Sequence, residues 1–578
     1  MLKNLQPEQV KKYSKNELNV LCDELRSTIY ETVTHCGGHL ASNLGAVEST
    51  VALFYVFDFP KDKIVFDVGH QCYTYKLLTG RADRFSTLRQ AGGISGFPKR
   101  TESEYDSYDT GHAGTSVSAA IGLGKARDLL GEEGHVIAYI GDGSFNNGLV
   151  YEALSSLKIV NTKILIILND NGMSISPTVG GMYDIIADIK ENGSADSIKL
   201  LENFGLTYLG VKNGNDLEEM VDAMQEAKAL LEKGSVLLHI ATKKGKGYEF
   251  SEEHPTNTHG VPPVGSPKVK EYSEVLGESL CSLAAKDPKI IVVSAAMKEA
   301  LGLADFFEKY PERAFDVGIC EENAATLCAA MAAGGLKPYF AIYSTFLQRS
   351  FDEIIHDVCA QDMPVTFCID RAGISGADGE THQGVFDLSY LSLIPNLAIA
   401  APKDTDELEK MLQFSATYAH PLAIRYPRAG KLLFPAKDKP IKAGEWEYLQ
   451  KGSGAKATIL AVGERCLIIA MKVAQALKEQ GKEVDVVNAR FVKPLDVELL
   501  KGLTSEHVVT MEDNVFLGGF GSAVNGEMIK LGKAVKMKNF AYRDEFIPQG
   551  SVSQLQSDYG VSCKELEDYL TDVLHESR

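Results

Sequence analysis

The sequence predicts an α/β protein of three domains, each built on a mainly parallel sheet flanked by helices. Short apolar runs alternate with helical patterns, which is typical of parallel sheets covered on both faces. A chain of 578 residues is also too long for a single hydrophobic core. Prolines and glycines interrupt the alternation at "GVPPVGSPKVKEY" (260–272). We therefore expect domains at residues 1–265, 270–430 and 435–578.

The apolar runs mark the expected strands. In the first domain they are "KIVFDVG" (63–69), "VIAYIGDG" (136–143), "ILIILNDN" (164–171) and "VLLHIATKKG" (236–245). The second domain repeats the scheme with "IIVVSAA", "PYFAIYS", "PVTFCIDRAG" and "NLAIAAPKD". The third contains "KATILAVGE", the helical "CLIIAMKVAQALKEQG" and then "EVDVVNARFV". Similar α/β domains in tandem indicate an old duplication.

Composition and charge argue against several classes of protein. Lys and Arg number 59 against 78 Asp and Glu, and no basic run offsets the formal charge of −19, so we expect neither nucleic acid nor membranes as partners. The first residues carry no apolar signal core, and no stretch reaches the roughly 18 apolar residues of a membrane span. We therefore expect a cytoplasmic protein. The ten cysteines include no CxxC pair, so we expect reduced thiols and no zinc.

Polar side chains follow two of the predicted strands. "GDG" (141–143) ends one apolar run, and "NDNGMS" (169–174) ends the next. Ligands bind at the carboxyl ends of parallel strands, and the oxygens of Asp142 and Asn171 suit Mg²⁺ together with phosphate. The helix start in "TGHAGTSVSAAIGLG" (110–124) could meet that phosphate with free N–H groups. The simpler interpretation is that both stretches are only turns.

A GDG followed by an asparagine in an NDN-type loop resembles the thiamine diphosphate enzymes. The resemblance implies thiamine diphosphate and Mg²⁺ as cofactors. It implies Asp142, Asn171 and the main-chain carbonyl of Met173 as metal ligands. It also places cofactor contacts in the neighbouring loops, at Gly111, His112, Ala113, Gly143 and Ser144 as well as at Asn171 and Met173.

Longer motifs narrow the family. The stretches "GGHLASNLGAVESTVAL" (37–53), "DVGHQCY" (67–73), "YSTFLQRSFDEIIHDV" (343–358) and "DRAGISGADGETHQGVFDLSYL" (370–391) resemble the 1-deoxy-D-xylulose-5-phosphate synthases of the transketolase-like group. A transketolase would have His-Asp-Ser in place of "DRAG" and HQP in place of "HQG".

The resemblance implies a reaction and an assembly. Pyruvate would be decarboxylated and its two-carbon unit added to D-glyceraldehyde 3-phosphate, giving CO₂ and 1-deoxy-D-xylulose 5-phosphate, a precursor of isoprenoids and thiamine. The protein would be a homodimer in which the first and second domains of one chain form each site.

The resemblance also assigns the groups around the cofactor. Glu321 would be the acid beside the pyrimidine ring, Tyr343 and Phe346 would wall the ring, and Lys244 would contact the diphosphate. Without the family, Glu321 is a carboxylate at a helix start. The two aromatic residues would then be core residues and Lys244 a surface lysine.

Histidines and arginines are the expected substrate contacts. The catalytic candidates, besides Glu321, could donate or shuttle protons; they are His39, His112, His259, His382 and Asp378, with His70 as a cofactor contact. Guanidinium groups bind phosphate through paired hydrogen bonds. The candidates for the substrate phosphate are Arg371, Arg428 and Arg349. The alternatives are structural histidines and arginines in ion pairs between domains.

Three departures from the family pattern leave the acceptor aldehyde open. Glu322 and Asn323 replace an expected Gln-His pair, Asn215 replaces an expected histidine, and the chain between Ser176 and Gly205 is shorter than expected. A transketolase-like transferase with another donor or aldehyde is the alternative enzyme. A cofactor-binding relative without turnover is the alternative from a different class.

Overall fold

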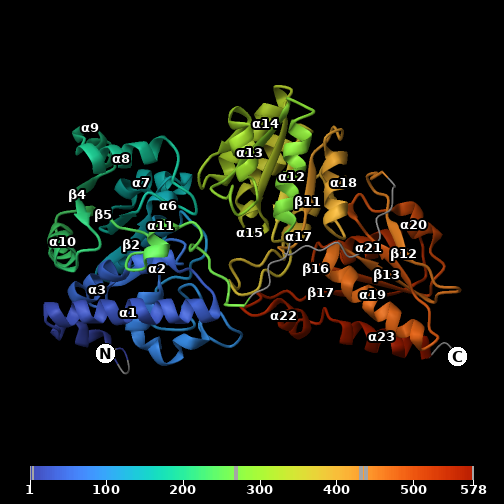
Figure 1. The fold of residues 1–578 in the computed structure, drawn as a ribbon, viewed down its shortest axis with the longest axis horizontal. Helices are drawn as coiled ribbons and strands as arrows, with labels where there is room; N and C mark the ends of the chain where they lie inside the picture. Colours follow the sequence, from blue (N-terminus) through green and yellow to red (C-terminus); the bar gives the residue numbers. More distant parts are fainter. Residues whose placement is uncertain (1, 3–4, 266–270, 429–433, 435–439, 576–578) are drawn as a thin grey trace. The chain divides into compact units, whose positions relative to one another are not determined.

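The computed structural model describes residues 2, 5–265, 271–428, 434 and 440–575. They form three sheets, of five, seven and five strands, with helices packed against them (Figure 1). Nearly all strand pairs are parallel. The predicted fold class is confirmed.

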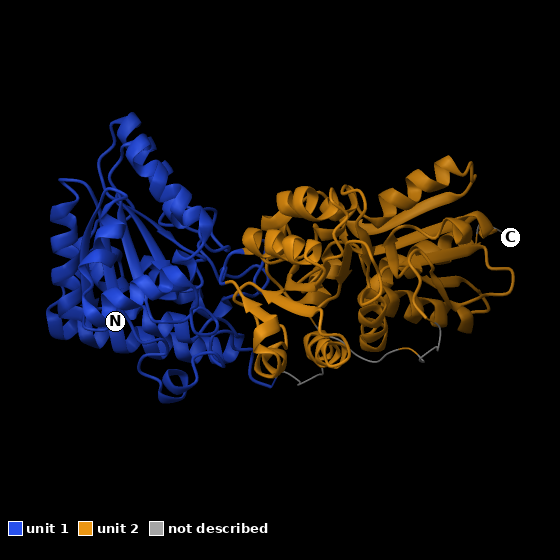
Figure 2. Cartoon of the chain, turned by 90° about the horizontal axis from the view of Figure 1, so that it is seen from above, with its two compact units in different colours: residues 1–267, 318–320, 377–381 blue, residues 268–317, 321–376, 382–578 orange. Residues whose placement is uncertain are grey.

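The chain divides into two compact units (Figure 2). Unit 1 comprises Met1–Pro267 with two short segments from later in the chain, Gly318–Cys320 and Ala377–Thr381. Unit 2 holds the rest, and with it the second and third sheets. The predicted domain borders at 265–270 and 430–435 fall almost wholly on residues outside the described ones, so the division into three domains stays a prediction.

The first sheet is entirely parallel, in the order β1-β2-β3-β5-β4. Its strands are β1 (Lys63–Phe66), β2 (Val136–Gly141), β3 (Leu165–Asp170), β4 (Leu206–Asn213) and β5 (Ser235–Ala241). The helices of this unit are α1 (Lys15–Cys36), α2 (Ala41–Gly45), α3 (Val47–Val56), α4 (Tyr73–Lys76), α5 (Ser116–Leu130), α6 (Asp142–Phe145), α7 (Gly148–Val160), α8 (Gly181–Asn192), α9 (Ala195–Glu202), α10 (Leu217–Leu230) and α11 (Glu249–Glu253).

Alternate residues of the central strands supply two hydrophobic cores. Ile137 and Tyr139 of β2 pack with α1, α3 and α10, whereas Ala138 and Ile140 of the same strand pack with α5, α7 and α8. Successive side chains of a strand point to opposite faces of the sheet. A strand buried on both faces must therefore be apolar throughout, as the run "VIAYI" is.

The second sheet has the order β15-β10-β11-β9-β8-β6-β7. Its strands are β6 (Ile290–Ser294), β7 (Ala314–Asp316), β8 (Lys337–Tyr343), β9 (Thr366–Asp370), β10 (Ala398–Ala400), β11 (Leu422–Arg425) and β15 (Phe491–Lys493). The helices between them are α12 (Tyr272–Ala284), α13 (Ala304–Lys309), α14 (Glu321–Ala333), α15 (Ser344–Leu347), α16 (Phe351–Glu353), α17 (Asp387–Ser392) and α18 (Thr405–Ser415). The edge strand β15 is antiparallel to β10 and comes from the predicted third domain.

The third sheet has the order β12-β14-β13-β16-β17, with β12 antiparallel to β14. Its strands are β12 (Glu447–Gln450), β13 (Ala457–Ala461), β14 (Asp485–Asn488), β16 (His507–Val515) and β17 (Lys536–Tyr542). The helices are α19 (Gly463–Glu479), α20 (Val497–Gly502), α21 (Phe520–Lys530), α22 (Val552–Asp558) and α23 (Cys563–His575).

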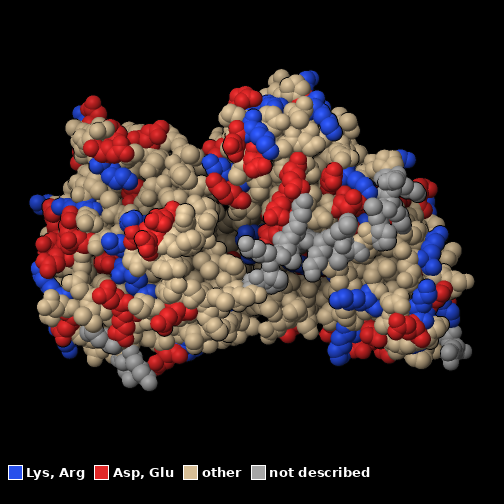
Figure 3. Space-filling model, viewed as in Figure 1, with Lys and Arg blue, Asp and Glu red and all other residues tan. Residues whose placement is uncertain are grey.

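The surface and the thiols show features that bear on the expected partners. On the face drawn in Figure 3, acidic and basic side chains of the described residues are interspersed, without a continuous basic area. Across the described part of the chain, no helix is both long and apolar enough to span a membrane. The cysteines are free thiols, and most are buried.

Candidate functional site

Three strand ends of the first sheet bring the predicted metal and diphosphate residues together. Gly141 of β2 pairs with Asn169 of β3, and Asp170 of β3 pairs with Ala241 of β5. The strands thus end at the same level, because the register of a parallel sheet fixes where each chain leaves it. Asp142, Asn171 and Lys244 follow these ends by one to three residues.

Asp142 is a fully buried carboxylate at the start of α6. Its oxygens accept hydrogen bonds from the Asn171 N–H at 3.2 Å and from the Thr178 hydroxyl at 2.5 Å. Burial raises the pKa of Asp142 to about 6, and the nearby charge of Asp170 adds to the increase. A cation bound there would remove the cost of burying this negative charge.

The loop after β3 turns its polar groups toward the same place. The Asn171 side-chain oxygen accepts the Met173 N–H at 3.1 Å, and the Lys244 ammonium donates to the Ser174 carbonyl. Lys244 is only 5% exposed, and burial lowers its pKa to about 8. Among the described residues, no carboxylate forms an ion pair with Lys244. The alternative interpretation of Lys244 as a surface lysine is therefore excluded, and its predicted contact with the diphosphate stays a prediction.

The "TGHAGTS" stretch is held in unit 1 by Asp67, a buried residue that was not among the predicted site residues. Its two oxygens accept the Gly114 N–H at 2.8 Å and the Ser116 N–H at 3.0 Å. Burial raises the pKa of Asp67, although hydrogen bonds from Gly114, Ser116 and Ser144 oppose the increase. Asp67 therefore fixes the start of α5 and contacts the predicted cofactor residue Ser144.

Glycines allow close approach at two of the predicted cofactor positions. A Cβ atom at Gly143 would lie 2.8 Å from the Ser174 side chain, and one at Gly111 would lie 2.3 Å from that of Thr381. Any larger residue would displace these neighbours. Ala113, another predicted cofactor contact, is buried, at 7% exposure.

Three of the predicted histidines form a triangle in unit 1. The ring centroids of His39, His70 and His259 lie 5.3 to 5.4 Å apart, and Phe97 packs on His39 at 5.9 Å. Burial lowers the pKa of His259 well below its usual range, and the positive charge of Lys244 contributes to the decrease. The triangle is thus a set of close imidazoles in which His259 is neutral near pH 7.

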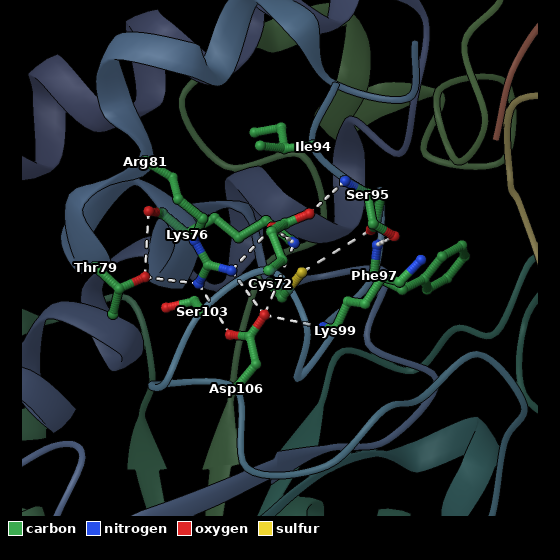
Figure 4. Close-up of polar contacts among 12 residues, drawn as sticks. Cys72, Lys76, Thr79, Arg81, Ile94, Ser95, Phe97, Lys99, Ser103 and Asp106 are labelled. Carbon is green, nitrogen blue, oxygen red and sulfur yellow. Dashed lines mark hydrogen bonds and ion pairs between the residues drawn. The ribbon is translucent and has the colours of Figure 1, made fainter. Parts of the chain in front are cut away.

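A buried ionic cluster shapes the loop that follows α4. The Arg81 guanidinium binds both oxygens of Asp106, at 2.6 and 2.9 Å, and the Lys76 ammonium lies 2.5 Å from Glu102 (Figure 4). The second Glu102 oxygen accepts the Ser95 N–H at 2.7 Å. These contacts fix the loop that carries Arg89, Phe97 and Lys99.

The segment Ala377–Thr381 packs on this loop within unit 1. Arg89 binds the Asp378 carboxylate at 2.5 Å, and Lys99 binds Glu380 at 2.8 Å. The ring Nε2 of His112 lies 2.8 Å from the Thr381 carbonyl. Because a carbonyl only accepts, Nε2 of His112 carries a proton. The structure therefore brings Asp378 and His112 to one segment, and sequence reasoning missed Arg89, the partner of Asp378.

In unit 2, Glu321 begins α14 and is 3% exposed. The Arg349 guanidinium donates to its Oε2 at 3.1 Å, and the Ser350 hydroxyl donates to its main-chain carbonyl at 2.7 Å. Arg349 also lies 4.0 Å from Glu322. The structure therefore places Arg349, a predicted phosphate contact, on the predicted catalytic acid.

The predicted pyrimidine walls lie together in unit 2. The rings of Tyr343 and Phe346 are nearly parallel, with an interplanar angle of 18° and centroids 5.7 Å apart. The Arg371 guanidinium lies 3.9 Å above the Tyr343 ring, and His382 meets the edge of Phe346 at 5.5 Å. Burial raises the pKa of Tyr343 to about 12. The structure thus places two further predicted residues, Arg371 and His382, against this aromatic pair.

Arg371 adopts a left-handed backbone conformation, with φ of 56°. The preceding Asp370 accepts the Arg371 N–H at 2.6 Å and is buried, which raises its pKa to about 7. The other predicted phosphate residue, Arg428, is half exposed and lies 3.8 Å from Glu271.

Asn215, which departs from the family pattern, lies in unit 1. Its side-chain amide donates to the Gly45 carbonyl at 3.1 Å and to Glu48 at 3.2 Å, so it joins helices α2 and α3.

The residues of unit 1 fit an anionic cofactor that carries a metal ion. The buried Lys244 ammonium, which forms no ion pair with a carboxylate of the described residues, calls for an anion. Close by, the buried Asp142 carboxylate and the amide oxygen of Asn171 are oxygen ligands of the kind that Mg²⁺ binds. The glycines at 111 and 143 leave the backbone accessible, as phosphate binding requires.

Three family models match successive parts of the chain. Residues 2–200 and 193–242 match the family model for 1-deoxy-D-xylulose-5-phosphate synthase, residues 268–430 the transketolase pyrimidine-binding domain, and residues 444–566 the transketolase C-terminal domain. The 1-deoxy-D-xylulose-5-phosphate synthases of Clostridium perfringens and Carboxydothermus hydrogenoformans are 43% and 44% identical, over 98% of this chain and 98% of theirs. A solved transketolase from Campylobacter jejuni is 19% identical over 97% of this chain and 100% of that one, with a TM-score of 0.46.

The alignments to these synthases cover 98% of this chain and so extend over both units. The sequence resemblance is thereby confirmed at the level of the family. The chain belongs to the 1-deoxy-D-xylulose-5-phosphate synthase family of transketolase-like enzymes.

Proposed function

We propose that this protein condenses pyruvate with D-glyceraldehyde 3-phosphate to give CO₂ and 1-deoxy-D-xylulose 5-phosphate. The observation that carries the proposal is membership of the synthase family over 98% of the chain. The buried acid Glu321 and the polar strand ends of the first sheet support it. Thiamine diphosphate, when bound, supplies the carbanion that carries the two-carbon unit.

We assign the cofactor's diphosphate and its metal to unit 1. Asp142, Asn171 and the Met173 carbonyl would hold Mg²⁺, and Lys244 with the N–H groups of the "TGHAGTS" stretch would hold the diphosphate. The fit of a buried carboxylate and a buried ammonium to these two partners supports the assignment. Asp67 would keep the stretch in place by binding two of its N–H groups.

We assign the cofactor's pyrimidine ring to unit 2. Glu321 would hold a proton at a ring nitrogen, and Tyr343 and Phe346 would pack on the ring. The Arg349 guanidinium already donates a hydrogen bond to Glu321 Oε2, at 3.1 Å. We therefore place Arg349 beside the acid rather than on the substrate phosphate.

Histidines and arginines would serve the substrates. Arg371 and Arg428 would bind the phosphate of the aldehyde, and His39 and His259 would donate to oxygens that gain charge during addition. His70 would contact the cofactor. His112 and Asp378 lie at the segment Ala377–Thr381 of unit 1, and His382 follows this segment in the sequence. We assign all three to proton transfer.

The decisive experiment is mass spectrometry on the product of the purified protein with thiamine diphosphate, Mg²⁺, pyruvate and D-glyceraldehyde 3-phosphate, with CO₂ followed in parallel. A deoxypentulose phosphate with stoichiometric CO₂ is the expected result. CO₂ without this product would mean another acceptor aldehyde, and absence of CO₂ would favour a transketolase-like donor or a binding protein without turnover.

We also propose that the protein is a homodimer, as the family resemblance implies. Sedimentation equilibrium should give twice the chain mass of 62.9 kDa. A monomer with full activity would contradict this part of the proposal.

A further inference from the structure

A closed loop carries Arg371 and His382 near its two ends. The N–H of Gly373 donates to the Gly384 carbonyl at 2.7 Å, and the N–H of Gly384 donates back to Gly373 at 2.8 Å. These paired bonds form the base of the loop, residues 373–384. Arg371 precedes the base by two residues, and His382 lies two residues before its other end.

Side chains of the third sheet and its helix α19 bind both backbone groups of Ile374 at this base. Its N–H donates to Asp513 Oδ1 at 3.1 Å, and its carbonyl accepts from the Arg465 guanidinium at 2.6 Å. The same nitrogen of Arg465 lies 2.9 Å from Asp513 Oδ2, and the Tyr542 hydroxyl donates to Asp513 Oδ1 at 2.5 Å. Asp513 is itself buried, at 5% exposure. A buried carboxylate with this many charged and neutral donors has one fixed position.

Hydrophobic packing also holds the base of the loop. Ile374 and Val385, on either side of the base, are fully buried in the hydrophobic core of the third sheet. The Val515 N–H of β16 donates to the Val385 carbonyl at 2.9 Å. A Cβ atom at Gly373 would lie 1.9 Å from Asp513 Oδ2, so only glycine allows the carboxylate to come this close.

We propose that Asp513 is a positioning residue for the reaction: by binding Ile374, it sets where Arg371 and His382 lie against Tyr343 and Phe346. This inference rests on the proposed function, which assigns Arg371 to the aldehyde phosphate. Arg371 lies three residues from Ile374, and its guanidinium stacks on Tyr343 at 3.9 Å. Asp513 of the third sheet would thereby influence the reaction without touching the substrate itself.

The test compares Asp513→Ala with Asp513→Asn, which keeps an acceptor for Ile374. The control is Glu512→Ala, because Glu512 is the neighbouring buried carboxylate but binds the N–H groups of Phe520 and Gly521 instead, each at 2.7 Å. For each variant, kcat/KM is measured with D-glyceraldehyde 3-phosphate and with unphosphorylated D-glyceraldehyde. If Asp513→Ala fails to fold, Arg465→Met replaces it, since it removes the other bond to Ile374.

Misplacement of a binding group by about 1 Å costs on the order of 100-fold in rate. We expect Asp513→Ala to lower kcat/KM by about that factor for the phosphorylated aldehyde and by less than about tenfold for the unphosphorylated one, and Asp513→Asn to restore most of the loss. An equal loss with both aldehydes, or the same change of ratio in Glu512→Ala, would overturn the proposal.

Hydrogen exchange of the peptide 371–385 separates this proposal from the proposed function. Faster exchange in Asp513→Ala than in Glu512→Ala is expected even if the wild-type protein makes no deoxypentulose phosphate, in which case only the functional assignment fails. Unchanged exchange, together with wild-type product formation, would mean that Asp513 does not hold the loop.

Discussion

Lys244 illustrates how single residues prepare the site for an anion. Its ammonium is buried, and burial lowers its pKa to about 8. The charged form is therefore present below pH 8 and is lost as the pH rises through that value. A bound diphosphate would favour the charged form again.

We expect Lys244→Met to weaken thiamine diphosphate binding at pH 7 by at least about tenfold, because a hydrogen-bonded charge is lost. In the wild-type protein, affinity should fall between pH 7 and pH 9, and protons should be taken up on binding near pH 8. Titration calorimetry in two buffers of different ionisation enthalpy measures both effects. Lys243→Met is the control, since Lys243 is exposed and paired with Glu252. Proton uptake that persists in Lys244→Met would contradict the prediction.

Glu321 carries the second prediction at this scale. We expect Glu321→Gln to bind thiamine diphosphate but to exchange the cofactor's C2 proton at least about 100-fold more slowly, because the general acid is lost. The exchange is followed by NMR after transfer to D₂O. The neighbouring Glu322→Gln, whose native side chain is 37% exposed, serves as the control and should keep most of the exchange rate. Normal exchange in Glu321→Gln would remove the catalytic assignment.

At the scale of elements, loops that bear function are fixed by buried charges rather than by strands. The loop after α4 is held by Arg81 and Lys76, which bind Asp106 and Glu102 inside the protein. Loss of one partner leaves a charge buried without compensation, which costs far more than an exposed ion pair contributes.

Asp106→Ala should therefore lower the free energy of unfolding by about 3 kcal/mol. The change is measured by urea denaturation. Glu104→Ala, an exposed residue of the same loop, should be nearly neutral. Equal effects of the two substitutions would show that the cluster does not stabilise the loop.

At the scale of the whole molecule, sheets are joined by residues that are distant in sequence. Strand β15 completes the second sheet from within the C-terminal part, and Ile374 and Val385 from the second part enter the core of the third sheet. Buried carboxyl groups lie at such junctions. Glu512, within β16, has a pKa raised to about 8 by burial.

The raised pKa of Glu512 links stability to pH. The folded protein binds this proton more tightly than the unfolded chain, whose carboxyl titrates near 4.5, so the stabilisation is present below that value and lost as the pH rises toward 8. Between pH 5 and pH 8 we expect a loss on the order of 3 kcal/mol from this group. Glu512→Gln should show a flatter dependence on pH in urea denaturation. Identical slopes for the two proteins would refute the prediction.

Local patterns were sufficient for the elements and for the chemistry of individual positions. A short apolar run such as "VIAYI" indicates a strand buried on both faces, and glycines beside Asp142 and in "TGHAGTS" predict close approach of phosphate. The family motifs named Glu321 and Lys244. No local pattern could identify Asp67, Arg89 or Asp513, because their partners lie 47, 289 and 139 residues away.

The sequence by itself determined the α/β class, the family and the residue types of the candidate site, because periodicity and motifs are local properties of the chain. Only the tertiary structure decided which charges are buried and what each of them binds. It placed Arg349 on Glu321, buried Lys244 and fixed the loop at Ile374 through Asp513. The physical reason is that burial and pairing depend on which distant segments pack together, and these set the pKa values and positions on which the chemistry rests.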